Sequence, residues 1–306
     1  MTSTPPAQPL ALPIAYLNGE FVPVEEARIS PLDRGFIFGD GIYEVIPIYD
    51  GRALRMREHL LRMQRSMDFL ELRNPYPLDH WEEIIGELVS KNGGGNVSIY
   101  IQVTRGVAKR DFSPPQGLAP TVFMMANKLP TPSRELYENG ISCISLDDFR
   151  WERCHVKSTS LLGAVLLKHE ANQHHVDDCV LFRDGYLTES SSSNVCAIRK
   201  GVILCPPKDN LILPGITYDL MIELARRAGI PLEMRRVSRR EVGIADELWL
   251  TSSTKEVIAI TRLDGRPVGT GEHAGKPGPL FWKMFALFQD YKRSLPAAES
   301  TAKAAV

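Results

Sequence analysis

The sequence predicts an α+β protein of two domains, from three observations. The chain has 306 residues with 43% hydrophobic content, enough for one large or two medium domains. Segments that turn at Asn-Gly or Asp-Gly dipeptides indicate β-hairpins, and helix-like segments alternate with them in both halves of the chain. The stretch 127–140, marked by Pro130 and Pro132, is typical of a linker between the halves.

The first half combines hairpins, helices and a long loop. The apolar residues of the two helices recur at helical spacing, and the second helix ends at glycines. The loop 105–118 is charged and broken by prolines, which is typical of a functional loop in a compact domain. The elements predicted here are hairpins at 15–29 (turn Asn18–Gly19) and 41–55 (turn Asp50–Gly51), helices at 57–72 and 79–95, and strands at 96–106 and 119–129.

The second half has the same mixture. Its elements are predicted as a strand at 141–151, a helix at 160–175, hairpins at 180–189 and 194–205, a helix at 216–229, and a strand that enters a hydroxyl-rich loop within 246–260. The ends of the chain consist of Ala, Pro and small polar residues, which bury too little surface to stay ordered alone. The predicted organisation is an unstructured tail at 1–12, domains at 13–131 and 132–294, and a second tail at 295–306.

The composition excludes several classes of partner. Lys and Arg total 36 against 37 Asp and Glu, so the net charge of −1 gives no electrostatic basis for binding nucleic acid or an anionic membrane. The five cysteines form no CxxC pair and the histidines no HExxH motif, so neither a disulfide framework nor a metal site is expected. The N-terminal stretch lacks the basic start of a signal peptide. These features favour a cytoplasmic protein whose partners are small molecules or other proteins.

Three turns rich in hydroxyls or glycine are candidates for binding an anion. They lie at 189–194 (ESSSSN), 213–217 (LPGIT) and 251–254 (TSST), where a predicted strand ends or a predicted helix begins. Serine and threonine hydroxyls, together with backbone N–H groups at a helix N-terminus, bind phosphate well. Each turn alone is better described as a solvated turn. Together, the three turns favour a phosphate site.

Six blocks follow one another along the chain: DRGFIFGDGIYE, QVTRG, the RW-RC-VKS-SLLGAVLLK-EA stretch, TE-SSSNV, LPGIT and LW-TSSTKE. Taken together, they resemble the D-amino acid transaminase branch of the fold-type IV pyridoxal phosphate enzymes. The likeness extends from Tyr16 to about Arg293. It implies a smaller N-terminal α/β domain, a larger C-terminal pseudo-barrel domain and pyridoxal 5′-phosphate as cofactor. Branched-chain aminotransferases and aminodeoxychorismate lyase share the fold and several blocks, so the resemblance defines the cofactor better than the substrate.

The resemblance assigns three catalytic residues. Lys157 matches the lysine that the family links covalently to the cofactor, and as a general acid–base it would move the proton of the substrate Cα. Glu189 matches the carboxylate that pairs with the pyridine nitrogen and keeps it protonated, which makes the ring a better electron acceptor. Tyr43 matches a tyrosine whose hydroxyl can bond the substrate carboxylate or the lysine. Core packing of a strand tyrosine is the alternative for Tyr43.

The resemblance also implies a set of residues that hold the cofactor. Arg62 matches the family's phosphate-binding arginine, because a guanidinium fork suits two phosphate oxygens; a solvated arginine on a helix is the alternative. Leu213 matches the leucine on the ring face, although ordinary core packing describes it equally well. The remaining cofactor contacts implied are Ser193, Asn194, Ile216, Thr217, Ser252 and Ser253.

The substrate loop departs from the family pattern. Well-known members grip the substrate carboxylate with an Arg-x-His pair on a loop from the partner subunit of a homodimer. This chain keeps the arginine, Arg110, but Phe112 stands in place of the histidine. An apolar Phe112 could favour bulkier or carboxylate-free amines, as in (R)-selective amine transaminases. Alternatively Arg110 and Tyr43 suffice for the carboxylate, supplemented by residues elsewhere. The candidate supplements are Arg105, Lys109 and His155.

The favoured function is a ping-pong amino-group exchange between D-amino acids, of the D-alanine or D-glutamate type, and 2-oxo acids. Branched-chain L-amino acid transaminase, (R)-amine transaminase and lyase chemistry on the same fold remain alternatives. A non-catalytic binding domain is a third class of function, and the presence of both Lys157 and Glu189 counts against it. If Arg110 acts in trans, activity requires a homodimer.

Overall fold

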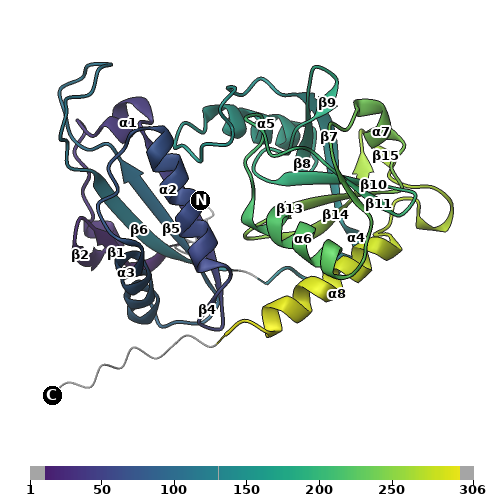
Figure 1. Ribbon diagram of the computed structural model, residues 1–306, viewed down its shortest axis with the longest axis horizontal. Coiled ribbons are helices and arrows are strands. Elements are labelled where there is room, and N and C mark those ends of the chain that lie inside the picture. The colour runs from purple at the N-terminus through teal and green to yellow at the C-terminus, as the bar shows by residue number, and fades with distance from the viewer. Residues whose placement is uncertain (1–10, 130, 297–306) are drawn as a thin grey trace, which may run out of the picture. The chain divides into compact units, whose positions relative to one another are not determined.

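The computed structural model describes residues 11–129 and 131–296, which form two compact units (Figure 1). The first unit holds 11–129 with 295–296, and the second holds 131–294. The predicted tails at 1–12 and 295–306 lie mostly outside the described residues. Ala11 and Leu12 correct the predicted N-terminal tail, because both belong to strand β1 (Ala11–Leu17). Ala11 pairs with Asn127 there, and Leu12 packs against the core.

The first unit is an antiparallel six-stranded sheet in the order β2-β1-β6-β5-β3-β4. Every second residue of β3, β5 and β6 points into one core, where helices α2 and α3 supply the opposing side chains. The opposite face of β3 carries Tyr43, so alternation along one strand separates the core from Tyr43. The remaining elements of the unit are β2 (Glu20–Pro23), η1 (Val24–Glu26), α1 (Arg34–Phe38), β3 (Gly41–Tyr49), β4 (Arg52–Ala53), α2 (Met56–Phe69), α3 (Leu78–Lys91), β5 (Val97–Thr104) and β6 (Thr121–Lys128).

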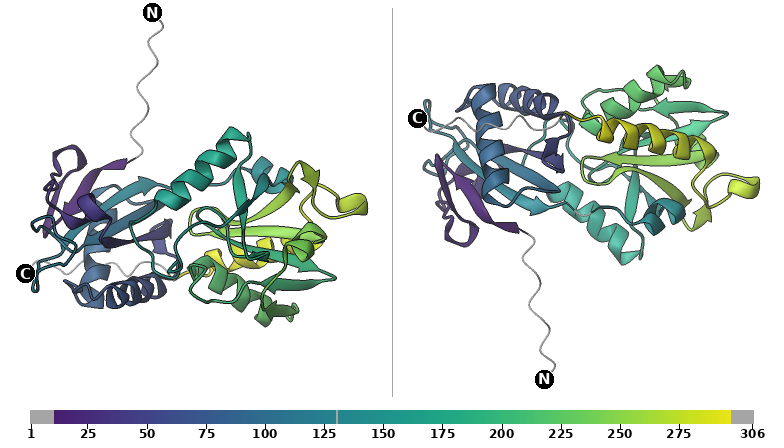
Figure 2. Two further views of the ribbon diagram at one scale, coloured as in Figure 1. Left: turned by 90° about the horizontal axis from the view of Figure 1, so that it is seen from above. Right: turned by 90° about the horizontal axis from the view of Figure 1, so that it is seen from below.

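The second unit is a mixed nine-stranded sheet in the order β12-β11-β10-β13-β14-β7-β8-β9, with β15 paired to β14. Strand β7 is parallel to both of its neighbours, and β11 is parallel to β12. Helices α6 and α8 pack on β13 and β14, and α5 packs on β7 and β8. Figure 2 shows α8 running along the sheet in the view from below. The strands of the second unit are β7 (Ile141–Asp147), β8 (Asp178–Arg183), β9 (Tyr186–Leu187), β10 (Asn194–Arg199), β11 (Val202–Cys205), β12 (Leu232–Met234), β13 (Glu247–Ser252), β14 (Glu256–Leu263) and β15 (Arg266–Pro267).

The helices of the second unit are α4 (Arg134–Asn139), α5 (Leu162–Gln173), α6 (Ile216–Arg227), α7 (Arg239–Gly243), the 3-10 turn η2 (Gly271–His273) and α8 (Pro279–Arg293). Helix α4 lies inside the predicted linker and begins at Ser133, whose hydroxyl accepts a hydrogen bond from Leu136 N at 3.1 Å. No helix within 11–129 and 131–296 is long and apolar enough to cross a membrane.

The predicted hairpins and long helices are confirmed. Asn18 and Gly19 have φ of 50° and 105°, and Asp50 and Gly51 have φ of 48° and 76°. Left-handed residues at both central positions suit two-residue hairpin turns, because they match the right-handed twist of the strands. In the second unit, Asp184–Gly185 and Lys200–Gly201 also have positive φ at both positions. Helices α1, α4, α7 and α8 were not predicted.

Candidate active site

Glu189 lies just after β9 and is almost completely buried. Its Oε1 accepts a hydrogen bond from Arg150 Nη1 at 2.5 Å. Its Oε2 accepts two more, from Leu213 N at 3.0 Å and from Asn194 Nδ2 at 3.2 Å. Asn194 Nδ2 also donates to Leu213 O at 2.8 Å. The structure therefore brings together three of the predicted site residues.

The electrostatics of Glu189 are set by burial and by one cation. Burial raises the pKa of Glu189 above its ordinary value, and the Arg150 guanidinium opposes that rise. A buried carboxylate with a fixed orientation can hold a proton on a nearby ring nitrogen. Sequence reasoning included Arg150 in a family block but gave it no role.

Arg150 is itself held by Asp148. Arg150 Nε and Nη2 donate to the two carboxylate oxygens of Asp148 at 2.9 and 2.8 Å. Thr188 Oγ1 donates to Asp148 Oδ2 at 2.9 Å, and Arg183 Nη2 lies 3.3 Å from Asp148 Oδ1. Burial raises the pKa of Asp148, but the hydrogen bonds and charge of Arg150 outweigh it, so the pKa lies below its ordinary value. This network was not predicted, because only the fold brings β7, Arg183 and the turn after β9 together.

Lys157 is half-buried in the loop between β7 and α5, and its neighbours Val156 and Ser158 are buried. The loop is anchored by Cys154 N, which donates to Asn210 O at 2.9 Å, and by Asn210 Nδ2, which donates to Glu152 O at 3.1 Å. A surface lysine on a solvated turn is usually far more exposed. The placement of Lys157 is thus unlike that of an ordinary surface lysine.

Several buried hydroxyls of the second unit lack a hydrogen-bond partner among the described residues. They include those of Ser193, Thr217 and Thr251. An unsatisfied buried hydroxyl costs about 1–3 kcal/mol, so such a group is expected to face a polar ligand or water. Thr217 lies in the first turn of α6, whose N-cap residue Gly215 provides no side-chain cap. Asn194 pairs with Thr251 across the sheet, which places these groups near the same strand ends.

Gly215 permits a close approach at this helix start. A Cβ at Gly215 would lie 2.2 Å from Asn194 Oδ1, a distance that no side chain can occupy. Asn194 in turn fixes Glu189 and Leu213. Asn194 therefore links the Glu189 carboxylate to the segment Leu213–Gly215, which leads into α6.

Asp178 joins two of the predicted hydroxyl-rich turns. Ser191 Oγ donates to Asp178 Oδ1 at 2.7 Å, and Lys255 Nζ donates to Asp178 Oδ2 at 3.3 Å. Lys255 N donates to Ser252 Oγ at 3.1 Å. Ser253 lies beside Ser252 and is half-buried. The turns at 189–194 and 251–254 are thus cross-linked through a carboxylate that sequence reasoning did not single out.

In the first unit, Arg62 is buried on α2 and pairs with Glu44 of β3. Arg62 Nη2 and Nε donate to Glu44 Oε1 and Oε2 at 2.6 and 3.0 Å, and His59 Nδ1 lies 3.0 Å from Oε1. Burial raises the pKa of Glu44, but Arg62 and His59 outweigh it and hold the pKa far below its usual range. The alternative of a solvated arginine on a helix surface is therefore wrong.

Tyr43 lies on the other face of β3 and is half-buried. Its ring stacks on Tyr100 with 5.8 Å between centroids, and Tyr100 Oη donates to Gln102 Oε1 at 2.7 Å. Burial, with a smaller contribution from Tyr43, raises the pKa of Tyr100 to about 12. Tyr43 thus lies outside the main core of its unit, against the core-packing alternative.

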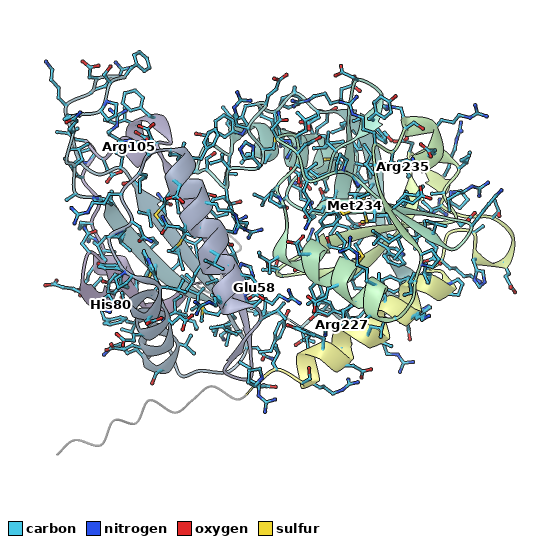
Figure 3. All side chains as sticks on the ribbon, in the orientation of Figure 1. Glu58, His80, Arg105, Arg227, Met234 and Arg235 are labelled. Atoms are coloured by element: carbon cyan, nitrogen blue, oxygen red, sulfur yellow. The ribbon has the colours of Figure 1, made fainter. Side chains whose placement is uncertain are left out.

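The loop that carries Arg110 and Phe112 is braced by other arginines. Arg34 donates to the carbonyls of Asp111 and Phe112 at 2.5 and 3.1 Å. Arg105, which is labelled in Figure 3, donates to Asp40 and to two carbonyls after α2, so its donors are used within the unit. Arg105 is therefore expected to brace the loop rather than bind substrate.

Arg110 and Phe112 themselves point to solvent. Phe112 is 82% exposed and packs loosely on Phe38, with 5.5 Å between ring centroids. The Arg110 guanidinium lies 5.6 Å from the centroid of the same ring. Both side chains are therefore available to a second molecule.

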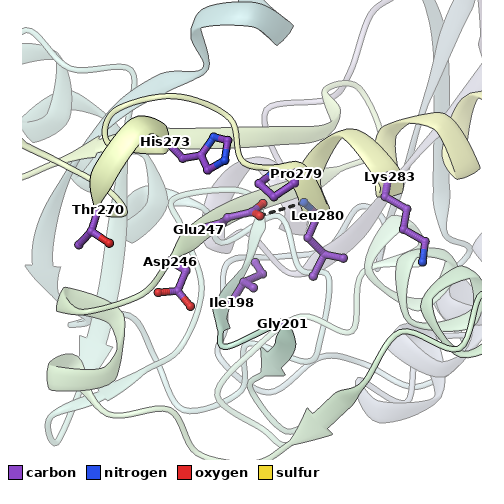
Figure 4. Close-up of a pocket in the computed structure, with 9 residues that line it drawn as sticks. All are labelled: Ile198, Gly201, Asp246, Glu247, Thr270, His273, Pro279, Leu280 and Lys283. Atoms are coloured by element: carbon purple, nitrogen blue, oxygen red, sulfur yellow. Dashed lines mark hydrogen bonds between the residues drawn. The ribbon is translucent and has the colours of Figure 1, made fainter.

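A separate pocket of about 520 Å³ lies at the opposite ends of β10 and β13 from Asn194 (Figure 4). Ile198 and Glu247 pair at that end of the two strands. Glu247 is committed to the start of α8, where it accepts hydrogen bonds from Leu280 N and Phe281 N at 2.9 and 2.8 Å. This pocket is not part of the Glu189 site.

The geometry can be compared with known proteins. A family model described as amino-transferase class IV matches residues 41–263, most of the chain. The chain belongs to the class IV aminotransferases. The enzyme is 37% identical to a D-alanine aminotransferase of Staphylococcus haemolyticus over 280 residues, covering 91% of this chain and 98% of the relative. It is also 37% identical to a D-alanine aminotransferase of Bacillus licheniformis, covering 86% of this chain and 91% of the relative.

Solved structures agree with the family. A branched-chain amino acid aminotransferase of T.th. with pyridoxamine 5′-phosphate has a TM-score of 0.86 at 26% identity, covering 92% of this chain and 94% of that chain. A fold IV-transaminase from Curtobacterium pusillum has a TM-score of 0.74 at 26% identity, covering 87% and 92%. The predicted two-domain fold type IV, with its C-terminal pseudo-barrel, is confirmed.

The enzyme is a pyridoxal phosphate-dependent aminotransferase, so its substrates are amino donors and 2-oxo acids. The residues of the second unit fit the cofactor. The buried carboxylate of Glu189 suits a ring nitrogen that carries a proton. The unpartnered hydroxyls, with the uncapped start of α6, suit a phosphate dianion.

Proposed function

We propose that the enzyme exchanges amino groups between D-amino acids, of the D-alanine or D-glutamate type, and 2-oxo acids by a ping-pong mechanism. The observation that carries this proposal is the 37% identity to D-alanine aminotransferases across 98% of a relative's length. The branched-chain enzyme of similar fold is only 26% identical.

In this proposal, residues of the second unit hold the cofactor ring and move the proton. When bound, pyridoxal phosphate withdraws electrons from the Cα–H bond of the substrate. Lys157 anchors the cofactor and serves as the general acid–base that takes the Cα proton. Glu189, fixed by Arg150, Leu213 N and Asn194, keeps the ring nitrogen protonated. Leu213 supports the ring face.

The phosphate is assigned to hydroxyls, backbone amides and one arginine. Thr217 and Ser193 contribute buried hydroxyls without other partners among the described residues. Arg62 is proposed as the cation for the phosphate, because Glu44 holds its guanidinium in one orientation. The other contacts proposed are Ile216 N–H at the start of α6, Ser252 and Ser253.

The substrate carboxylate is assigned to Arg110 and Tyr43. Phe112 is the observation that favours a second candidate, (R)-amine transamination, because an aromatic ring replaces a charge-assisted contact. A panel of D-amino acids, L-amino acids and (R)-amines distinguishes the candidates. D-alanine and D-glutamate are expected to convert the absorbance of the pyridoxal form to that of the pyridoxamine form within one half-reaction. Conversion by L-leucine alone, or by (R)-1-phenylethylamine alone, would replace the proposal.

A homodimer in which the Arg110 loop reaches the partner's site is also proposed. Each unit leaves large apolar side chains exposed: Phe36 and Phe112 in the first unit are 77% and 82% exposed, and Leu162 in the second is 70% exposed. Aromatic side chains are enriched at interfaces between proteins, so Phe36 and Phe112 are candidates for such an interface. A cytoplasmic location remains a proposal, and it is consistent with five free cysteines.

Mixing two inactive variants tests the action of Arg110 in trans. Lys157→Ala and Arg110→Met are each expected to be nearly inactive with D-alanine. If Arg110 acts in trans, a mixed dimer contains one intact site, so co-refolding the two variants is expected to restore up to about a quarter of the wild-type activity. Failure of the mixture to recover activity, with mixed dimers present, would exclude action in trans.

A further inference from the structure

The Arg150 guanidinium is divided unequally between two carboxylates. Two of its nitrogens, Nε and Nη2, donate to Asp148, whereas only Nη1 donates to Glu189. The backbone N of Arg150 also donates to Asp148 Oδ1 at 3.1 Å. Asp148 thus has the bidentate geometry of a strong arginine–carboxylate pair, and Glu189 has a single bond.

This division determines how much negative charge Glu189 retains. A guanidinium paired only with Glu189 would offset most of the negative charge of the carboxylate. The carboxylate would then stabilise a proton on the ring nitrogen of the cofactor less strongly. Asp148 competes for the same cation, and its side chain is fully buried, so water screens the competition little. Because opposite charges within about 4–6 Å shift a pKa by about 1–3 units, the competition is large enough to matter.

We propose that Asp148 is a positioning residue that limits how far Arg150 neutralises Glu189, and thereby keeps the ring nitrogen of the cofactor protonated. The inference rests on the proposed pairing of Glu189 with that nitrogen. Asp148 acts through Arg150, and its own negative charge adds a smaller direct contribution that raises the pKa of Glu189.

The surroundings of Glu189 contain few other charges. The charged groups of the network are Arg150, Asp148 and Arg183, which lies 3.3 Å from Asp148. Burial raises the pKa of the nearby Cys154 thiol to about 11, so the thiol is neutral. The donors on the other carboxylate oxygen, Leu213 N and Asn194 Nδ2, are uncharged. Removing the charge of Asp148 therefore leaves two arginines opposite one carboxylate.

The test is the protonation of the ring nitrogen in enzyme loaded with pyridoxal phosphate labelled with ¹⁵N at that position. In Asp148→Asn, the ¹⁵N chemical shift is expected to move towards that of neutral pyridine, and its titration midpoint is expected to fall by about 1 unit or more. Asp184→Asn is the matched control, because it makes the same change at an exposed turn position with φ of 51°, which asparagine tolerates. The control is expected to keep the wild-type shift.

Two further variants separate the possible causes. Thr188→Val removes a hydrogen bond to Asp148 without changing charge, so it is expected to leave the ¹⁵N shift unchanged. An equal shift in Thr188→Val would mean that loop placement, not charge, controls the nitrogen, and the inference would be overturned. Glu189→Gln measures the full effect of losing the carboxylate. If Glu189→Gln left the ¹⁵N shift unchanged, the proposed role of Glu189 would fail, whereas a shift in Glu189→Gln without one in Asp148→Asn would overturn only the role of Asp148.

A measurement on enzyme without cofactor tests how Arg150 controls the charge of Glu189. In apo-enzyme carrying Arg150→Met, the pKa of Glu189 is expected to rise further, because the guanidinium that opposes the effect of burial is gone. The infrared difference between Arg150→Met and Arg150→Met/Glu189→Gln, followed as a function of pH, is expected to show the C=O stretch of the protonated carboxyl persisting to higher pH than in Arg150→Lys, which keeps a cation. A C=O stretch that disappeared at the same pH in both variants would contradict the assigned control by Arg150.

Discussion

Replacing Lys157 by alanine is expected to lower kcat for D-alanine transamination by about 10²–10⁴-fold, the usual contribution of a general acid–base. The change removes both the anchor of the cofactor and the group proposed to move the Cα proton. Steady-state kinetics at saturating D-alanine and cofactor measure the loss. Added methylamine is expected to recover part of the rate, since a small amine can accept the proton in place of the lysine.

The control for this change is Lys283→Ala on the exposed face of α8, beside the pocket of Figure 4 and remote from Glu189. That variant is expected to keep the wild-type rate. An undiminished rate in Lys157→Ala, with a borohydride-stable adduct on another lysine, would contradict the assignment.

Replacing Glu44 by glutamine is expected to lower the free energy of unfolding by about 3–5 kcal/mol at pH 7, because the change leaves the buried Arg62 without its carboxylate partner. Chemical denaturation of the apo-enzyme measures the loss without a contribution from the cofactor. Glu58→Gln is the control. Glu58 lies on α2, the helix that carries Arg62; it is half-exposed, and its Oε1 lies 3.6 Å from Arg55 Nη1 (Figure 3). An exposed pair of this kind contributes about 0–1 kcal/mol.

The pH dependence of this difference has a definite sign. The folded state lowers the pKa of Glu44, so the stabilisation is complete above the unfolded-state pKa of about 4.3 and is lost as the pH falls towards the lower folded-state value. The gap between wild type and Glu44→Gln is therefore expected to shrink below about pH 4. A gap that widened in acid would contradict the ion pair as its source.

Local chemistry made much of the fold predictable. Asn-Gly and Asp-Gly dipeptides define hairpins because their turn needs positive φ at both positions, a property of the dipeptide itself. Helix α8 was missed for the opposite reason. Its start depends on Glu247, which accepts hydrogen bonds from Leu280 N and Phe281 N after a long separation along the chain. A cap supplied from a distant strand is not visible in the sequence, although Pro279 at the first helical position and Lys292 and Arg293 in the last turn are helix signals that the prediction did not use.

The candidate site likewise contains residues that the sequence predicts and residues that only the fold brings together. Hydroxyl-rich turns and the start of α6 were predictable, because the residue types that bind phosphate lie next to one another in the sequence. The partners that orient Glu189 and the turns were not. Asp148, Arg150 and Asp178 acquire their roles only when β7, β8 and the turn at 189–194 become neighbours.

Asp178 has a consequence for how the enzyme acquires its cofactor. Because this carboxylate ties Ser191 to Lys255, the turns at 189–194 and 251–254 are already fixed before pyridoxal phosphate arrives. A ligand that enters a rigid cradle loses less free energy to the ordering of loops, so more of its contact energy remains as affinity. The entropic cost of ordering the two turns is met during folding, so the apo-enzyme is expected to hold them in the conformation that binds the cofactor.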